Sequence, residues 1–141
     1  MCQVLTACSG DVGNTGDSGV PEPDASDGGT LGFTCTGASP KFSTDVTPIL
    51  SSCAGGELCH GGLATTVWAY DQLVNVKATR DSCSSANMLV APGSLDQSYL
   101  MHKLTGIGMC PQTNRMPFGD PLPDAKIQTI ADWICQGAPN D

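Results

Sequence analysis

The stretch Cys53-Ala-Gly-Gly-Glu-Leu-Cys59-His60 places two thiols and an imidazole close together, with the imidazole directly after the second thiol. The usual signature for covalent attachment of a c-type haem is C-x-x-C-H, and here five residues instead of two separate the cysteines. The pattern predicts that Cys53 and Cys59 bind the two haem vinyl groups and that His60 ligates the iron. Met116, which precedes a proline 56 positions after His60, is the candidate ligand on the opposite side.

The same side chains permit two other interpretations. A disulfide between Cys53 and Cys59, beside a surface His60, would make the stretch purely structural. A zinc site built from these three side chains is the third interpretation. The spacing fits no common zinc knuckle, and an oxidising compartment disfavours such a site.

Apolar residues recur at helical spacing from about residue 41 onward, and no convincing alternating strands are present. Ser94 and Gln97 form a capping box that predicts a helix start, and Gly106 ends that helix. A Gly- and Pro-rich loop follows from Gly106 to Pro121 and contains Met116. The predicted helices span about Asp45–Cys53 (capped by Ser43 or Thr44), Thr65–Val74, Ser94–Thr105 and Pro123–Gln136. The expected fold is therefore mostly helical, with long loops.

The order and spacing of these segments make the region from Lys41 to Ala138 resemble the single-haem c-type cytochrome domains of bacterial envelope lipoproteins, which are class I cytochrome c-like. The resemblance implies a small helical domain whose long loops surround one haem c, with Met116 as the distal iron ligand. The stretches that carry it are Phe42–Leu50, Cys59–Gly62, Ala91–Leu104, Arg115–Gly119 and Ile127–Ala138.

Other residues compete with Met116 for the distal position. Met88, Met101 and Met109 are the other methionines of this region, and most methionines fill gaps in cores. His102 is the main rival because imidazole also binds iron, although a solvated histidine is the commoner outcome in a predicted helix beside a lysine. Arg115 is expected to pair with a haem propionate or to lie at the surface.

The first forty residues differ from the rest of the chain, because they contain five acidic residues and no Lys or Arg. Such a segment cannot bury enough apolar surface to offset the entropy of ordering it, so Ser9–Thr30 is expected to be disordered. Leu5-Thr6-Ala7-Cys8 matches the bacterial lipobox, in which the cysteine is acylated. The expected organisation is a truncated signal and lipobox over 1–8, a spacer over 9–40 and a cytochrome c-like domain over 41–141.

Eight cysteines in 141 residues indicate an oxidising compartment. With Cys8 acylated and Cys2 removed with the signal, four cysteines remain outside the haem motif, and four allow three pairings. In the resembled family the first and last helices cross, which favours a bond between Cys35 and Cys135. Cys83 would then pair with Cys110.

The net charge is −8, and no cluster of Lys or Arg provides the electrostatic footprint of a nucleic-acid-binding protein. We expect a lipoprotein of the cell envelope, periplasmic or at the cell surface, with the outer membrane favoured. Its partners would be redox proteins, the membrane through the lipid on Cys8, and other copies of itself.

Filled axial positions would keep small substrates from iron, so electron transfer is expected instead of catalysis. A haem-free, disulfide-stapled scaffold or adhesion lipoprotein with a cytochrome c-like shell is the alternative. A peroxidase with an open distal site is a third interpretation, if Met116 points away from the iron.

Overall fold

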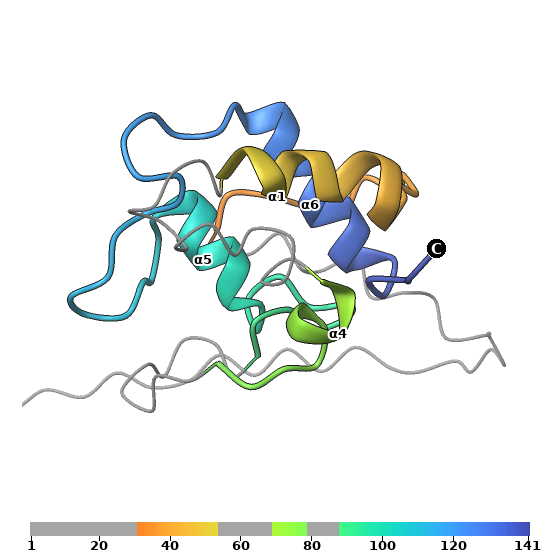
Figure 1. Cartoon of the computed structure of the whole chain (residues 1–141), viewed down its shortest axis with the longest axis horizontal. Coiled ribbons are helices and arrows are strands. Elements are labelled where there is room, and N and C mark those ends of the chain that lie inside the picture. Colours follow the sequence, from red (N-terminus) through yellow and green to blue (C-terminus); the bar gives the residue numbers. More distant parts are fainter. Residues whose placement is uncertain (1–30, 54–68, 79–87) are drawn as a thin grey trace, which may run out of the picture.

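The computed structural model describes residues 31–53, 69–78 and 88–141 (Figure 1). The helical prediction is confirmed, because these residues form short helices joined by turns and by isolated β-bridges, without a strand among them. The elements are η1 (Phe42–Val46, a π-helical turn), α1 (Thr47–Cys53), α4 (Tyr70–Leu73), α5 (Tyr99–Thr105) and α6 (Asp124–Cys135).

Helix α6 forms where the periodicity predicts it. It begins after Pro123, carries Asp124 in its first turn, and is followed by Gly137, whose φ of 99° is in the left-handed region. One face of the helix is fully buried against the rest of the domain. Its buried apolar residues are Ile127, Ile130, Ala131, Trp133 and Ile134.

The first helix starts earlier than predicted and is not capped by Ser43 or Thr44. Both residues lie inside the π-helical turn η1, which continues directly into α1. The backbone N–H of Ser43 donates instead to Oδ1 of Asp141, at 3.0 Å. Phe42, at the start of the turn, stacks on Trp133 with ring centroids 5.1 Å apart. Packing of Phe42 onto α6 therefore extends the helical segment beyond its local capping signal.

Helix α5 starts later than the predicted capping box at Ser94 and Gln97. Its N-cap is Ser98, whose side chain is fully buried and makes no capping hydrogen bond. The Ser98 hydroxyl donates to the carbonyl oxygen of Ser94 at 2.6 Å and accepts from the backbone N–H of Ala91 at 2.9 Å. These bonds hold residues 91–98 in turns. The prediction that a capping box starts the helix at Ser94 is therefore wrong.

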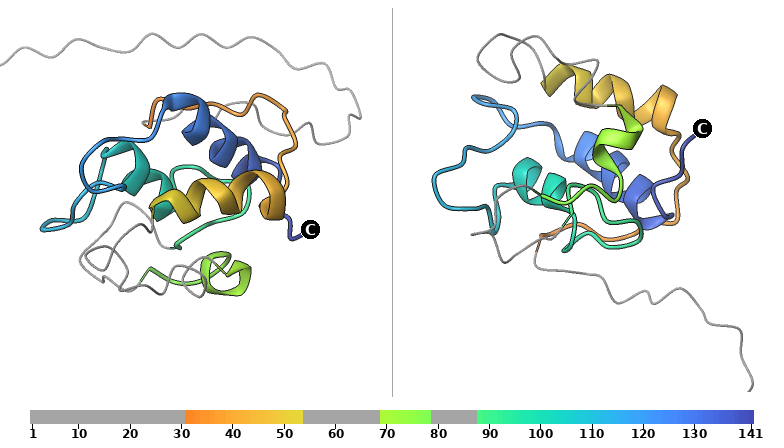
Figure 2. Two further views of the ribbon diagram at one scale, coloured as in Figure 1. Left: turned by 45° about the horizontal axis from the view of Figure 1, so that its top comes forward. Right: turned by 60° about the horizontal axis from the view of Figure 1, so that its bottom comes forward.

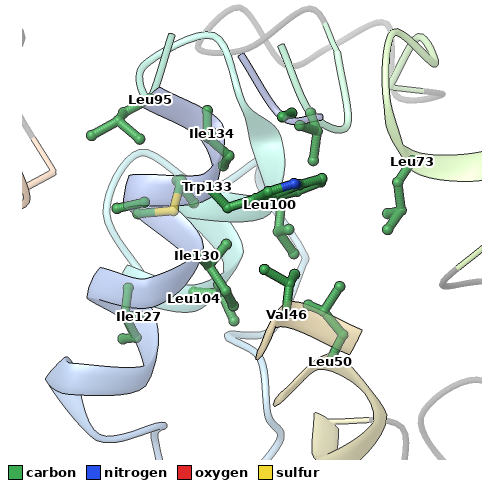
Figure 3. Packing of buried hydrophobic residues seen from close by; sticks show 14 of the residues in the cluster. Val46, Leu50, Leu73, Leu95, Leu100, Leu104, Ile127, Ile130, Trp133 and Ile134 are labelled. Carbon is green, nitrogen blue, oxygen red and sulfur yellow. The ribbon is translucent and has the colours of Figure 1, made fainter. Parts of the chain in front are cut away.

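The core lies where α6 packs against η1 and α5, as Figure 3 shows. Trp133 is at its centre, and its indole N–H donates to the carbonyl of Pro139 at 3.0 Å. Burial of each large apolar side chain contributes about 1.5–3 kcal/mol, and this term stabilises helices too short to form alone. The buried residues around Trp133 include Val46, Leu50, Leu100, Leu104, Ile127, Ile130 and Ile134.

Residues 31–40 form a segment that we call the N-terminal strap, and it packs onto α6 (Figure 2). Leu31 is only 2 % exposed and belongs to the core cluster. The backbone N–H and hydroxyl of Thr36 donate to the two carboxylate oxygens of Asp132, at 2.7 and 2.8 Å. The strap is therefore held on α6 by side-chain and backbone contacts.

Helix α4 is the described end of the predicted helix Thr65–Val74, whose residues 65–68 lie outside the described residues. The Tyr70 ring packs edge-on against the Phe42 ring, with ring centroids 5.4 Å apart. The Tyr70 hydroxyl donates to the carbonyl of Ala138 at 2.8 Å. The isolated bridge between Val74 and Val90 links the end of this segment to the residues before α5. These contacts connect α4 to both ends of the described fold.

Candidate functional site

The candidate site is built on residues 106–121, which we call the methionine loop because it carries Met116. The loop starts at Gly106, whose φ of 79° and N–H bond to the His102 carbonyl end α5 as predicted. A Cβ at this position would lie 3.2 Å from Cδ of Arg115. Glycine is thus required for the left-handed turn and leaves space for the arginine to pass close to the helix end.

The methionine loop folds back onto the C-terminal turn of α5. Nε of Arg115 donates to the carbonyl of Leu104 at 2.8 Å, and the backbone N–H of Met116 donates to the carbonyl of Lys103 at 2.8 Å. Nζ of Lys103 in turn donates to the carbonyl of Asn114. Carbonyls in the last turn of a helix lack hydrogen-bond donors within the helix. The loop supplies such donors to α5, and these hydrogen bonds fix the position of Met116 relative to the helix.

The side chain of Met116 is partly buried, packs against the core cluster, and lines a cavity of about 290 Å³. The described lining residues come mainly from α4, α5 and the methionine loop: Gln72, Leu73, Leu89, Tyr99, Leu100, Lys103 and Met116. Most of these side chains are apolar, and the others are polar. An apolar lining with a few polar groups is typical of a ligand pocket. The thioether thus sits in an apolar environment, where it can act as a soft metal ligand.

Arg115, the predicted propionate partner, is not among the described residues that line this cavity. Its Nε is engaged with Leu104, so the side chain fastens the methionine loop. Tyr99 and Lys103 line the cavity instead, and sequence reasoning missed both. Both could have been predicted to lie on one face of the helix, because they are four positions apart in the predicted helix.

His102 is buried, not solvated as expected, and only 5 % of it is exposed. Nδ1 lies 2.9 Å from the carbonyl oxygen of Ile107, and Nε2 lies 2.9 Å from that of Asp96. Both ring nitrogens therefore face backbone oxygens. Neither is available to a metal in this conformation, which removes the main structural rival of Met116 as distal ligand.

Helix α1 ends at Cys53, so a helix leads directly into the C-x5-C-H stretch as the sequence predicts. Cys59 and His60 lie outside the described residues. Within the described residues, the Met116 thioether lines an apolar cavity, and a methionine thioether is one of the side-chain ligands that the iron of c-type haem takes.

Two of the predicted disulfide cysteines are joined as expected. Cys35 and Cys135 form a disulfide with a Cα–Cα distance of 5.7 Å, which ties the N-terminal strap to the end of α6. Cys110, which is almost fully buried, is also disulfide-bonded. Its predicted partner Cys83, and the predicted lipidation site Cys8, lie outside the described residues.

The residues that the structure describes contain neither a metal-ion cluster nor a membrane-spanning helix. Within residues 31–53, 69–78 and 88–141, no group of three or more His, Cys, Asp or Glu side chains is placed to hold a metal ion. In the same ranges, no helix has both the length and the apolar character needed to cross a bilayer. Comparison of the chain with protein-family models, with curated proteins and with solved structures gives no match.

Proposed function

We propose that this chain is a single-haem c-type cytochrome domain that transfers electrons one at a time in the bacterial cell envelope. Cys53 and Cys59 attach the haem covalently, and His60 ligates the iron. Met116 is the ligand on the opposite side. When bound, the haem supplies a reversible one-electron couple, whose potential is raised by a methionine ligand.

The observation that carries this proposal is the Met116 side chain in an apolar cavity, in a chain that also contains the haem-attachment pattern of Cys53, Cys59 and His60. The methionine is held by backbone hydrogen bonds between its loop and α5, and it lines an apolar cavity. A methionine that only fills space in a core needs to be buried. Packing alone would not explain why the same chain also contains a C-x5-C-H pattern. The combination of the two features favours a cofactor role over simple packing.

The residues that line the cavity would have different roles at a haem site. Leu73, Leu89 and Leu100 exclude water from the cavity, which favours the reduced, less charged state of a bound cofactor. Lys103, which lines the cavity, and Arg115 are the two candidate cations for a haem propionate, and each donates to a backbone carbonyl in this structure. With a protein ligand on each side of the iron, the domain carries electrons and does not act as an enzyme.

The proposed location follows from the N-terminal sequence. A lipid on Cys8 would anchor the domain to the envelope, preferably to the outer membrane, through the spacer that follows. The disulfide between Cys35 and Cys135 agrees with an oxidising compartment. Redox proteins would be the main partners, and self-association would extend the distance of electron transfer.

The test is the intact mass and visible spectrum of the full chain, produced in a host that matures c-type haem. We expect a mass increase of one haem that survives denaturation, with sharp absorption bands after reduction. Replacing both Cys53 and Cys59 by Ser should abolish the covalent increase. A colourless protein, lighter than the reduced chain by the hydrogens of three disulfides, would overturn the proposal.

The axial assignment needs a separate test with a matched control. Met116→Ala should change the ferric spectrum and lower the reduction potential. Met109→Ala changes a methionine that is also partly buried in the methionine loop, and it should leave both unchanged. Equal spectra for Met116→Ala and the unmodified protein would rule out Met116 as the ligand.

A haem-free scaffold is the second candidate, and the disulfides favour it. Cys35 and Cys135 are bonded to each other, and Cys110 is also oxidised, so the domain is covalently closed without any cofactor. In this case Cys53 and Cys59 would form a disulfide too. Peptide mapping of the unreduced chain distinguishes this bond from two thioether-linked cysteines.

A further inference from the structure

A chain of three hydrogen-bonded groups connects helix α5 to the methionine loop. The hydroxyl of Tyr99, a residue that lines the cavity, lies 3.3 Å from the hydroxyl oxygen of Thr113. The Thr113 hydroxyl donates to the carbonyl of Cys110 at 2.7 Å, and the Thr113 backbone N–H donates to the same oxygen at 3.3 Å. Cys110 is almost fully buried and disulfide-bonded, so the chain ends on a firmly held part of the loop.

The direction of the contact between Tyr99 and Thr113 follows from the number of protons. A threonine hydroxyl has one proton to donate and two lone pairs that accept. That proton is directed to the Cys110 carbonyl, which only accepts. The threonine oxygen is therefore the acceptor toward Tyr99, and the phenol is the donor. The hydroxyl proton of Tyr99 is thus directed to the loop and not to an occupant of the cavity.

The contact with Tyr99 gives the methionine loop a second attachment on α5. The Met116 backbone N–H donates to the carbonyl of Lys103, in the last turn of the helix. Tyr99 lies about one turn earlier, roughly 6 Å along the helix axis, and binds Thr113, three positions before Met116. A segment attached at one point can pivot about it, whereas two separated attachments fix its direction. Because Tyr99 and Met116 line the same cavity, this direction affects where the thioether lies in it.

We infer that Tyr99 is a positioning residue for Met116 and that it acts by donating a hydrogen bond to Thr113. The Tyr99 ring stacks on the His102 ring, with centroids 6.3 Å apart, so the place of the ring does not depend on the hydroxyl. Removing the hydroxyl alone therefore removes the contact with the loop and keeps the packing of the ring. The role of Met116 as an iron ligand rests on the proposed function, whereas the hold of Tyr99 on the loop does not.

The first test is hydrogen exchange of the full chain, which needs no cofactor. In Tyr99→Phe, exchange at the Met116 amide should accelerate about two- to tenfold, as expected for the loss of one hydrogen bond between neutral groups. Tyr70→Phe is the matched control, because it changes the other tyrosine of the chain, whose hydroxyl donates to the Ala138 carbonyl at 2.8 Å. This control should leave the Met116 amide unchanged. Unchanged exchange in Tyr99→Phe, or equal acceleration in both variants, would overturn the inference.

Substitutions of Thr113 test whether Tyr99 acts through this residue. Thr113→Ser keeps the hydroxyl, so its Met116 amide should exchange as in the unmodified protein. Thr113→Val removes both hydroxyl contacts and should accelerate this exchange at least as much as Tyr99→Phe. Adding Tyr99→Phe to Thr113→Val should then cause no further acceleration, because the acceptor of the phenol is already absent. Additive accelerations would show that Tyr99 acts independently of Thr113 and would contradict the inference.

The haem-loaded chain provides a measurement that a purely structural role of Tyr99 would not change. Tyr99→Phe should alter the ferric spectrum and lower the reduction potential, because it loosens the methionine ligand, whereas Tyr70→Phe should change neither. If the chain binds haem and both properties are unchanged in Tyr99→Phe, the inference is wrong and the proposed function stands. If the chain binds no haem, the proposed function fails, and hydrogen exchange alone decides whether Tyr99 positions Met116.

Discussion

The N-terminal strap and the methionine loop are both irregular segments that lie on a helix, but they are fastened in different ways. The strap is joined to α6 by the bond between Cys35 and Cys135 and by the contacts of Thr36 with the buried Asp132. The methionine loop also contains a disulfide-bonded cysteine, Cys110, but it is held on α5 itself by hydrogen bonds to backbone carbonyls. The strap is therefore bonded covalently to its helix, whereas the contacts that position Met116 against α5 are hydrogen bonds that can open locally.

The largest expected effect comes from breaking the scaffold at its centre. Trp133 has no exposed surface, so Trp133→Ala should lower the free energy of unfolding by about 3–5 kcal/mol through loss of burial and formation of a cavity. Phe118→Ala is the matched control, since this ring in the methionine loop is 73 % exposed and should change stability little. Urea denaturation followed by circular dichroism measures both, and similar losses would refute the contrast.

The covalent part of the strap contributes the next largest effect. Replacing both Cys35 and Cys135 by Ser should lower the free energy of unfolding by about 2–4 kcal/mol, because the bond restricts an unfolded loop with a sequence separation of 100. Urea denaturation of the double variant measures this loss. A loss well below about 1 kcal/mol would show that noncovalent contacts alone hold the strap on α6.

A smaller and local effect is expected in the methionine loop. Arg115→Ala removes the bond from Nε to the Leu104 carbonyl, at a cost of about 1 kcal/mol, and should loosen the loop before it weakens the core. Hydrogen exchange at the Met116 amide, which donates to Lys103, should accelerate relative to that of core amides in α6. Uniform acceleration at both places would mean that loop and scaffold open together.

The smallest effect concerns the acidic end of the pH range. The backbone N–H of Ser43, with its hydroxyl and the nearby Lys41, lowers the pKa of the Asp141 side chain. A lowered pKa stabilises the fold above the usual range of an aspartate, and this stabilisation is lost as the pH falls through the folded value. Ser43→Ala should move the titration midpoint of the Asp141 carboxyl, measured by nuclear magnetic resonance, partly back toward its ordinary value.

Periodicity predicted α6 almost to its ends, because its buried face, first-turn acid and terminal glycine all indicate the same helix. The start of α5 was predicted wrongly at Ser94, because the capping box is a local signal and the buried hydroxyl of Ser98 binds backbone groups in the preceding turn. Similarly, Phe42 extends the first helix through its contact with Trp133, which lies far along the chain.

The candidate site was predictable only in its chemistry. Met116 was proposed as a ligand from its type and its neighbours, whereas the contacts of Arg115 and His102 are with backbone carbonyls, which a sequence does not distinguish. The strap was assigned to the spacer because its composition is polar. Its attachment depends on a few particular residues, mainly Leu31, Cys35 and Thr36, and average composition does not reveal them.

The bond between Cys35 and Cys135 also determines how the domain would bear a mechanical load. Tension applied to the chain before the strap would reach the disulfide at Cys35 and pass into the C-terminal end of α6, so residues 36–40 of the strap would stay on the helix. The methionine loop lies on α5, outside this direct load path (Figure 1). A domain connected in this way can be pulled from its N-terminal side while the geometry around Met116 is shielded from the force.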